Sequence, residues 1–162
     1  MHGIPGEAGI PHAGGRPVKL GRGCALRNLR RASALLERGR GVLMASSYTV
    51  LLVDDDVDAR EITAHMLGSR GFDVLVAQSG HEAMRVLAKI RPDVLLADIV
   101  MPDLNGIELA KRAKLLQPDL KVAFMTGYYS RAAEAARLGK LLFKPVRGAE
   151  IETELRNLIA EA

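Results

Sequence analysis

Acidic side chains follow two of the apolar runs in this chain, a position from which carboxylates can bind a ligand. Asp98 ends the run at residues 94–97, and three consecutive acids, Asp54–Asp56, follow the run at residues 48–53. A carboxylate that ends a buried strand of an open α/β sheet lies at the edge where such sheets bind ligands. Asp98 by itself could also cap a turn, and the three acids could simply crowd a helix N-terminus, where negative charge is favoured.

Carboxylates that meet at one edge repel one another, so they either raise their pKa values or hold a cation. A hard divalent ion such as Mg²⁺ suits such a cluster, because it prefers oxygen ligands in octahedral geometry and keeps several waters. We predict that the carboxylates of Asp55 and Asp98 hold this ion, helped by Asp54 through water and by the backbone carbonyl of Val100.

The elements that must position these residues alternate regularly from residue 48 onward. Apolar runs of strand length are separated by segments whose apolar residues recur at helical spacing. Ser79 with Glu82 forms a capping-box pattern, and Asn105 repeats the helix-start signal. The expected strands are 48–53, 72–77, 93–98, 120–126 and 140–143. The expected helices are 57–70, 79–90, 105–117, 129–138 and 148–160.

Five successive strand–helix units predict an α/β fold with one doubly wound, five-stranded parallel sheet. Parallel strands need crossover helices, which cover both faces of the sheet and follow a right-handed path. In the first helix we expect Ile62, Met66 and Leu67 to face the core. The strands end at one edge, so Thr126 after the fourth strand and Lys144 after the fifth should lie beside the acidic residues.

Together, these residues resemble the receiver domain of two-component response regulators, over about residues 48–162. The match lies in the order and approximate spacing of the acids, a glycine, a Thr-Gly pair and a Lys-Pro pair. It rests on Asp54–Asp56, Asp98 to Pro102, Gly106, Thr126-Gly127 and Lys144-Pro145. The resemblance implies a flavodoxin-like sheet with strand order 2-1-3-4-5, and receivers commonly have a cis peptide at the Lys-Pro pair.

The resemblance also implies a function. Asp98 would accept a phosphoryl group from a phosphohistidine with Mg²⁺ beside it, while Lys144 and Thr126 contact the phosphoryl oxygens. The donor would be a histidine kinase or a histidine phosphotransfer protein of a phosphorelay, docked through a helix against the first helix. We expect a single-domain regulator that catalyses only its own phosphorylation and dephosphorylation. It would signal to an output protein by changed contacts, or act as a phosphate sink.

Two departures from the receiver pattern concern how phosphorylation is sensed and how fast the acyl phosphate decays. Many receivers have an aromatic residue three positions before the lysine, whereas this chain has Leu141. The run Phe124 to Tyr129 partly resembles the FATGUY group of single-domain regulators, so Tyr129 either takes over the switching role or packs over a shortened helix. Val100 and Tyr128 offer no carboxylate or amide to orient water, so the acyl phosphate should decay slowly.

A basic segment precedes the expected domain. Residues 1–43 carry eight Arg and Lys against two Glu, a net charge of +6, and nine of the 16 glycines, whereas the remainder carries a net charge of −2. This composition predicts disorder. We expect a passive tail, or sequence translated before a true start at Met44, rather than a nucleic-acid-binding arm. The single cysteine, Cys24, and the lack of any stretch of membrane-spanning length favour a cytoplasmic protein without membrane contact.

Other classes of function fit single motifs. The apolar run that leads into Asp54 and Asp56 imitates the start of haloacid-dehalogenase-type phosphatases, with Asp54 as nucleophile, but no later acidic pair supplies a metal ligand. A flavin-binding relative is disfavoured because the acidic loop would repel a phosphate. A DNA-binding regulator would act through residues 1–43. His65 and His81 lie on expected helices away from the carboxylates, so we expect surface positions for them.

Overall fold

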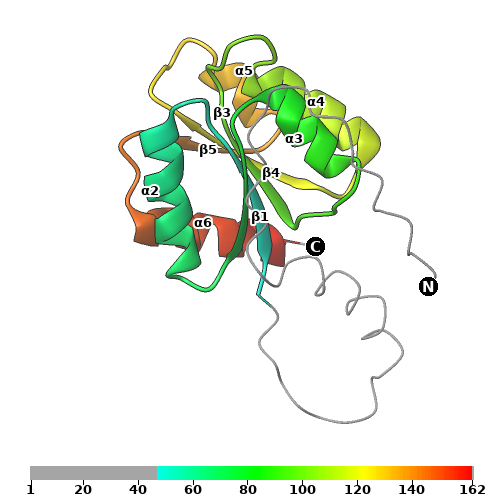
Figure 1. Ribbon diagram of the computed structural model, residues 1–162. Helices are drawn as coiled ribbons and strands as arrows, with labels where there is room; N and C mark the ends of the chain where they lie inside the picture. Colours follow the sequence, from blue (N-terminus) through cyan, green and yellow to red (C-terminus); the bar gives the residue numbers. More distant parts are fainter. Residues whose placement is uncertain (1–46, 162) are drawn as a thin grey trace, which may run out of the picture.

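The computed structural model describes residues 47–161 as one five-stranded parallel sheet with helices on both faces (Figure 1). The strands run in the order β2-β1-β3-β4-β5, which confirms the expected fold class and strand order. The predictions for residues 1–43 and Met44 fall outside the described residues. The strands are β1 Thr49–Val53, β2 Asp73–Ala77, β3 Val94–Asp98, β4 Lys121–Thr126 and β5 Lys140–Phe143.

The helices lie where they were expected, and several are shorter. Ser79 Oγ accepts the N–H of Glu82 at 3.2 Å, and Asn105 Oδ1 accepts the N–H groups of Ile107 and Glu108, so both predicted caps are present. The fourth helix has only five residues, in line with the shortened helix expected there. The helices are α2 Val57–Gly68, α3 Gly80–Leu87, α4 Gly106–Leu116, α5 Ala132–Ala136 and α6 Gly148–Ala160.

Side chains of the interior strand β1 pack alternately into two cores, because successive side chains point to opposite faces of the sheet. Leu51 and Val53 pack in the cluster that includes residues of α3, α4 and α5. Val50 and Leu52 pack with residues of α2 and α6. Figure 1 shows these two groups of helices on opposite faces of the sheet. The strand is therefore buried on both sides, which explains its continuous apolar sequence.

One expectation for α2 is wrong. Ile62 was predicted to face the core, but 61% of its surface is exposed, while Thr63 is buried with Leu67. Thr63 and Leu67 are four residues apart, so they share the face that packs on the sheet, and this turns Ile62 away from it. Met66 is partly buried against the same core. Helix α2 therefore presents an apolar side chain to solvent.

Candidate functional site

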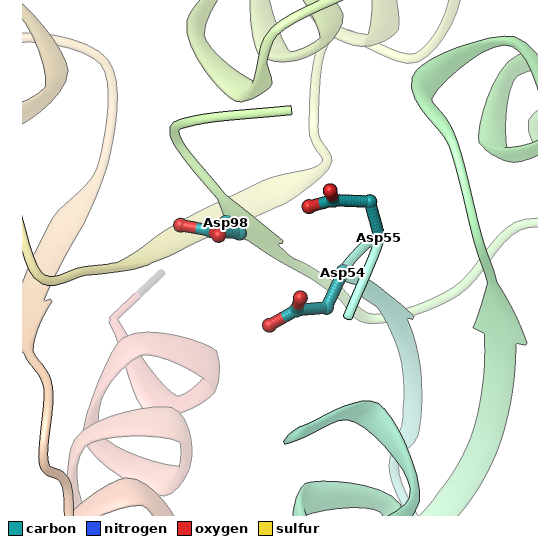
Figure 2. A group of neighbouring side chains, drawn as sticks. All are labelled: Asp54, Asp55 and Asp98. Atoms are coloured by element: carbon teal, nitrogen blue, oxygen red, sulfur yellow. The ribbon is translucent and has the colours of Figure 1, made fainter. Parts of the chain in front are cut away.

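The carboxyl ends of β1 and β3 bring three carboxylates together. Oxygens of Asp54, Asp55 and Asp98 lie within 4.8 Å of one another. Figure 2 shows the three side chains side by side at the two strand ends. The register of the sheet explains the arrangement, because Val53 pairs with Ala97 and the acids follow these residues directly. Asp54 is buried and Asp55 is exposed, so the cluster opens toward solvent.

Hydrogen bonds hold the loop after β1 in place. The N–H of Asp56 donates to Asp54 Oδ1 at 3.0 Å, and the Asp56 carboxylate caps α2 by accepting the N–H of Ala59 at 3.0 Å. Arg60 Nη1 donates to the backbone carbonyl oxygen of Asp54 at 2.6 Å. The helix-capping interpretation of the acidic triplet therefore holds for Asp56, whereas Asp54 and Asp55 join Asp98.

The backbone of Asp98 is packed tightly against the start of α4. The N–H of Gly106 donates to the carbonyl oxygen of Ile99 at 3.0 Å. A Cβ atom on Gly106 would collide with the carbonyl oxygen of Asp98. Glycine is therefore needed where the helix begins this close to β3, which gives a physical reason for the glycine that the sequence motif contains.

A lysine from the end of β5 reaches two of the carboxylates. Lys144 Nζ lies 2.9 Å from Asp54 Oδ2 and 3.4 Å from Asp98 Oδ2. The backbone N–H of Lys144 donates to the carbonyl oxygen of Thr126 at 2.9 Å. The peptide bond from Lys144 to Pro145 is cis, as the resemblance implied. The tertiary structure thus brings together the ends of β1, β3, β4 and β5, as the topology predicted.

The charges of these groups depend on one another. Burial raises the pKa of the Asp98 carboxyl; Lys144 lowers it, and the negative charge of Asp54 raises it further, with the net pKa above the ordinary value. The backbone N–H of Val100 also donates to this carboxylate and favours its ionised form. Burial lowers the pKa of Lys144, but its hydrogen bond to Asp54 and the charge of Asp98 outweigh burial and raise that pKa. Lys144 is therefore held in its charged form.

Thr126 lies at the same edge, with its hydroxyl bound to the loop that follows β4. The residue is fully buried, and its Oγ1 accepts the N–H of Tyr128 at 3.0 Å. The same hydroxyl is placed to donate to the carbonyl oxygen of Tyr128 at 3.3 Å, a long distance for a bond between two oxygens. The hydrogen bond that the hydroxyl accepts from Tyr128 is thus stronger than the one it donates. Its proton is therefore available to another acceptor.

Exposed aromatic rings beside Lys144 were only partly foreseen. The ring of Tyr129 stacks on that of Phe143, with centroids 4.7 Å apart and planes inclined by 21°. Tyr128, Tyr129 and Phe143, which we call the aromatic patch, are exposed over 62%, 76% and 38% of their surfaces. Phe143 was missed, although it lies two residues after the partly buried Leu141 and therefore on the same face of β5. Phe143 directly precedes Lys144, whereas many receivers have their aromatic residue three positions before the lysine.

The donor set of the acidic cluster fits a hard divalent cation. All three side chains offer carboxylate oxygens, which Mg²⁺ prefers. The Asp55 carboxylate has no hydrogen bond or ion pair to any other residue that the structure describes, so it is free to bind a cation. The part played by the Val100 carbonyl stays a prediction. His65 and His81 are exposed and do not belong to this cluster.

Comparison with known proteins agrees with this arrangement. The family model for the response regulator receiver domain matches residues 50–156. The chain belongs to this family. The response regulator receiver protein CpdR of Brucella abortus is 36% identical over 117 residues, which cover 70% of this chain and 98% of CpdR. The response regulator MprA of Mycolicibacterium vanbaalenii is 32% identical over 114 residues, and the chain spans 49% of its length.

A solved receiver domain has a similar fold. The CheY-like response regulator receiver domain from Methanospirillum hungatei matches with a TM-score of 0.68 and 28% identity, covering 72% of this chain and 96% of that one. Membership of the receiver family goes against the phosphatase and flavin-binding alternatives. Asp54, the nucleophile of the phosphatase alternative, is 1% exposed and bound to Lys144. Within residues 47–161, none of the helices has the length and apolar character to span a membrane.

Proposed function

We propose that this chain is a single-domain response regulator that accepts a phosphoryl group on Asp98 in a phosphorelay. The observation that carries the proposal is the position of the Asp98 carboxylate, within 4.8 Å of the oxygens of Asp54 and Asp55 and 3.4 Å from Lys144 Nζ. The near-complete coverage of CpdR supports a receiver that acts without an attached output domain. The chain would catalyse only its own phosphorylation and dephosphorylation.

Among the clustered acids, Asp98 is best suited as the nucleophile. Both oxygens of Asp54 are engaged, one by the N–H of Asp56 and the other by Lys144, and the residue is buried. The Asp98 side chain is 13% exposed, so one of its oxygens can meet an incoming phosphorus atom. As its bond to phosphorus forms, the bond between phosphorus and the donor imidazole nitrogen breaks. The product on the protein is an acyl phosphate.

Charge stabilisation comes from residues at four strand ends. The oxygens of Asp54, Asp55 and Asp98, with the Val100 carbonyl as the expected fourth donor, would hold Mg²⁺, which supplies positive charge to the phosphoryl oxygens when bound. Lys144 supplies a second positive charge from β5. The hydroxyl of Thr126 would donate to a phosphoryl oxygen in place of the Tyr128 carbonyl, while it keeps the N–H of Tyr128 as donor.

The donor protein would dock on α2. Val57 and Ile62 are exposed over 54% and 61% of their surfaces, and Val57 begins this helix two residues after Asp55. Exposed apolar side chains beside a reactive site give a helical partner a surface to pack on. A histidine kinase or a histidine phosphotransfer protein could therefore bring its phosphohistidine to Asp98. The corrected position of Ile62 supports this docking face.

The output surface would be the face of α5, β5 and α6, which includes part of the aromatic patch. When the Thr126 hydroxyl turns its proton toward a phosphoryl oxygen, its bond to the Tyr128 carbonyl is lost. This links Asp98 to the loop that carries Tyr129, whose ring leans on Phe143. Tyr129 would therefore sense phosphorylation in place of the usual aromatic residue at the position of Leu141. An output protein would read the change, or the chain would drain phosphate from a shared kinase.

Intact-protein mass measurement tests the proposed chemistry. Wild-type protein incubated with Mg²⁺ and acetyl phosphate should gain one phosphate, and Asp98→Ala should gain none. Asp119→Ala removes an exposed acid that precedes β4, at the opposite edge of the sheet, and should behave as wild type. A phosphate on Asp98→Ala, or none on wild type, would contradict the assignment. Turnover of a phosphomonoester by Asp98→Ala would return the phosphatase alternative.

The same measurement tests the proposed organisation of the chain. We assign residues 48–162 to the receiver domain and residues 1–43 to a passive tail. Deletion of residues 1–43 should leave the rate and extent of phosphorylation unchanged, because the clustered acids and Lys144 all belong to the receiver domain. Salt-dependent DNA binding that disappears with this deletion would instead support the DNA-binding alternative.

A further inference from the structure

Arg60 turns its side chain back over the loop that holds Asp54 and Asp55. It lies in the first turn of α2 and is half-buried. Its Nη1 donates to the backbone carbonyl oxygen of Asp54 at 2.6 Å. In the described part of the chain, Arg60 forms no ion pair with any carboxylate. Its charge therefore stands beside the acidic cluster, while its hydrogen bond goes to the backbone.

The carbonyl that Arg60 holds belongs to the peptide that joins Asp54 to Asp55. This peptide is planar, so fixing the direction of its carbonyl restricts the direction in which Asp55 leaves the backbone. Asp54 has restraints of its own, because its N–H donates to the carbonyl oxygen of Ala77 and its carboxylate binds Lys144. The Asp55 side chain has no such partner among the described residues. The contact from Arg60 thus fixes the peptide before Asp55, and the hydrogen bond from the Asp56 N–H to Asp54 Oδ1 fixes the peptide after it.

We propose that Arg60 is a positioning residue for divalent-cation binding, which aims the Asp55 carboxylate at the oxygens of Asp54 and Asp98. The proposal rests on the Mg²⁺ site of the proposed function, and it is independent of whether Asp98 is phosphorylated. Arg60 would not touch the cation. It would act on the peptide backbone, as partners behind a metal ligand do in other sites.

The positive charge of Arg60 should change cation affinity in the opposite direction from its positioning role, which makes the proposal testable. A positive charge close to the acidic cluster disfavours a second cation, so removing that charge alone should tighten cation binding. Losing a contact that orients a ligand should weaken it, typically by about 10- to 100-fold. The direction of the change in affinity therefore separates positioning from a simple charge effect.

The experiment measures Mn²⁺ binding by the electron paramagnetic resonance signal of the free ion, and Mg²⁺ binding by competition, on the full chain. Arg60→Met should weaken Mn²⁺ binding by about tenfold or more. Arg60→Lys keeps the charge but lacks the planar fork, so it should also weaken binding. Arg112→Met removes the same charge from the exposed face of α4, where Arg112 pairs with Glu108 on its own helix, and should leave Mn²⁺ binding unchanged. Unchanged or tighter binding by Arg60→Met would overturn the proposal.

A double-variant comparison asks whether Arg60 acts through Asp55. Asp55→Asn should weaken Mn²⁺ binding, and adding Arg60→Met to it should weaken binding little further, because the ligand that Arg60 positions is already lost. Full additivity of the two changes would contradict the positioning role. Urea unfolding of each variant gives the folded fraction to which the affinities are referred. If wild type binds no Mn²⁺, the proposed metal site is wrong. If Asp55→Asn weakens Mn²⁺ binding but the Arg60 variants bind Mn²⁺ as wild type does, the metal site stands and only the role of Arg60 is wrong.

Discussion

The two halves of the site differ in how firmly they are held. The acidic half consists of Asp54, Asp55 and Asp98 with Gly106 behind them; here Asp54 is buried, and the backbones of Asp98 and Gly106 are closely packed. The aromatic half runs from Thr126 through the aromatic patch and α5, and its three rings are exposed. Phosphoryl transfer needs fixed geometry, whereas sensing needs a part that can move at low cost.

The helices on the two sides show the same contrast. Asp56 and Asn105 cap α2 and α4 through side-chain hydrogen bonds, but α5 begins after Arg131 without one. Helix α5 is tied to α4 by the exposed ion pair of Lys111 with Glu134, at 3.0 Å. Ion pairs this exposed to solvent contribute little to stability. We therefore expect the aromatic half to rearrange at lower cost than the acidic half.

The largest expected effect compares the same substitution in the two halves. Gly106→Ala should lower the free energy of unfolding by about 3 kcal/mol, because the new Cβ meets the Asp98 carbonyl oxygen. Gly127→Ala, between Thr126 and Tyr128, should change it by less than about 0.5 kcal/mol, since a Cβ there meets no atom within 4 Å. Urea unfolding measures both. Equal losses would mean that the halves are equally rigid.

The next effect concerns Lys144, which binds Asp54 and Asp98 of the acidic half through its side chain and Thr126 of the aromatic half through its backbone N–H. Lys144→Met should slow phosphorylation by acetyl phosphate about 100-fold, the usual loss when one group that stabilises transition-state charge is removed. Lys140→Met is the matched control, because Lys140 is exposed on the same strand and pairs with Glu154. Loss of activity in the control as well would point to damage of β5 rather than to a missing charge.

The direction of the pKa change of Asp98 tests its contact with Lys144. The pKa of Asp98 is raised in the folded chain, so its ionised form, which the reaction needs, is lost on acidification at a pH above that of an ordinary aspartate. Lys144 lowers that pKa, so Lys144→Met should raise it further. Carboxyl chemical shifts followed against pH without Mg²⁺ measure this. A lower pKa in the variant would contradict the assigned interaction.

A smaller effect concerns decay of the acyl phosphate, with one position in each half. Val100 and Tyr128 are exposed over 47% and 62% of their surfaces and carry no group that orients water well. Val100→Asn and Tyr128→Glu should each speed hydrolysis about tenfold, less than a well-placed general base provides. Loss of phosphate followed by mass measures the rate. If neither variant accelerates decay, the expected slow hydrolysis has another cause.

The smallest effect is the coupling between the two stacked rings. Tyr129→Ala, Phe143→Ala and the double variant should give a coupling free energy of about 0.5 kcal/mol, at the low end for aromatic pairs because both rings are exposed. Urea unfolding with and without a phosphoryl group on Asp98 measures the change. A coupling that phosphorylation leaves unaltered would make the stack a packing contact and remove Tyr129 as the sensor.

The sequence by itself determined the order of the elements and which residues end the strands. Periodicity separates strands from helices, and parallel strands share one carboxyl edge, so the sequence alone places Asp54, Asp98, Thr126 and Lys144 at the same edge of the sheet. The receiver motif strengthened the same prediction, because its residues lie at those strand ends. These conclusions depend on local sequence patterns and on the rules for parallel sheets, which leave few possible topologies.

Only the tertiary structure decided where individual side chains point. The rotation of α2 about its axis exposed Ile62 and buried Thr63, and the path of the loop after β4 bound the Thr126 hydroxyl to Tyr128. The contact from Arg60 to the Asp54 carbonyl likewise joins a side chain to a backbone atom six residues away. Sequence patterns describe which residues share a face, but these contacts depend on how the whole helix or loop packs against the sheet.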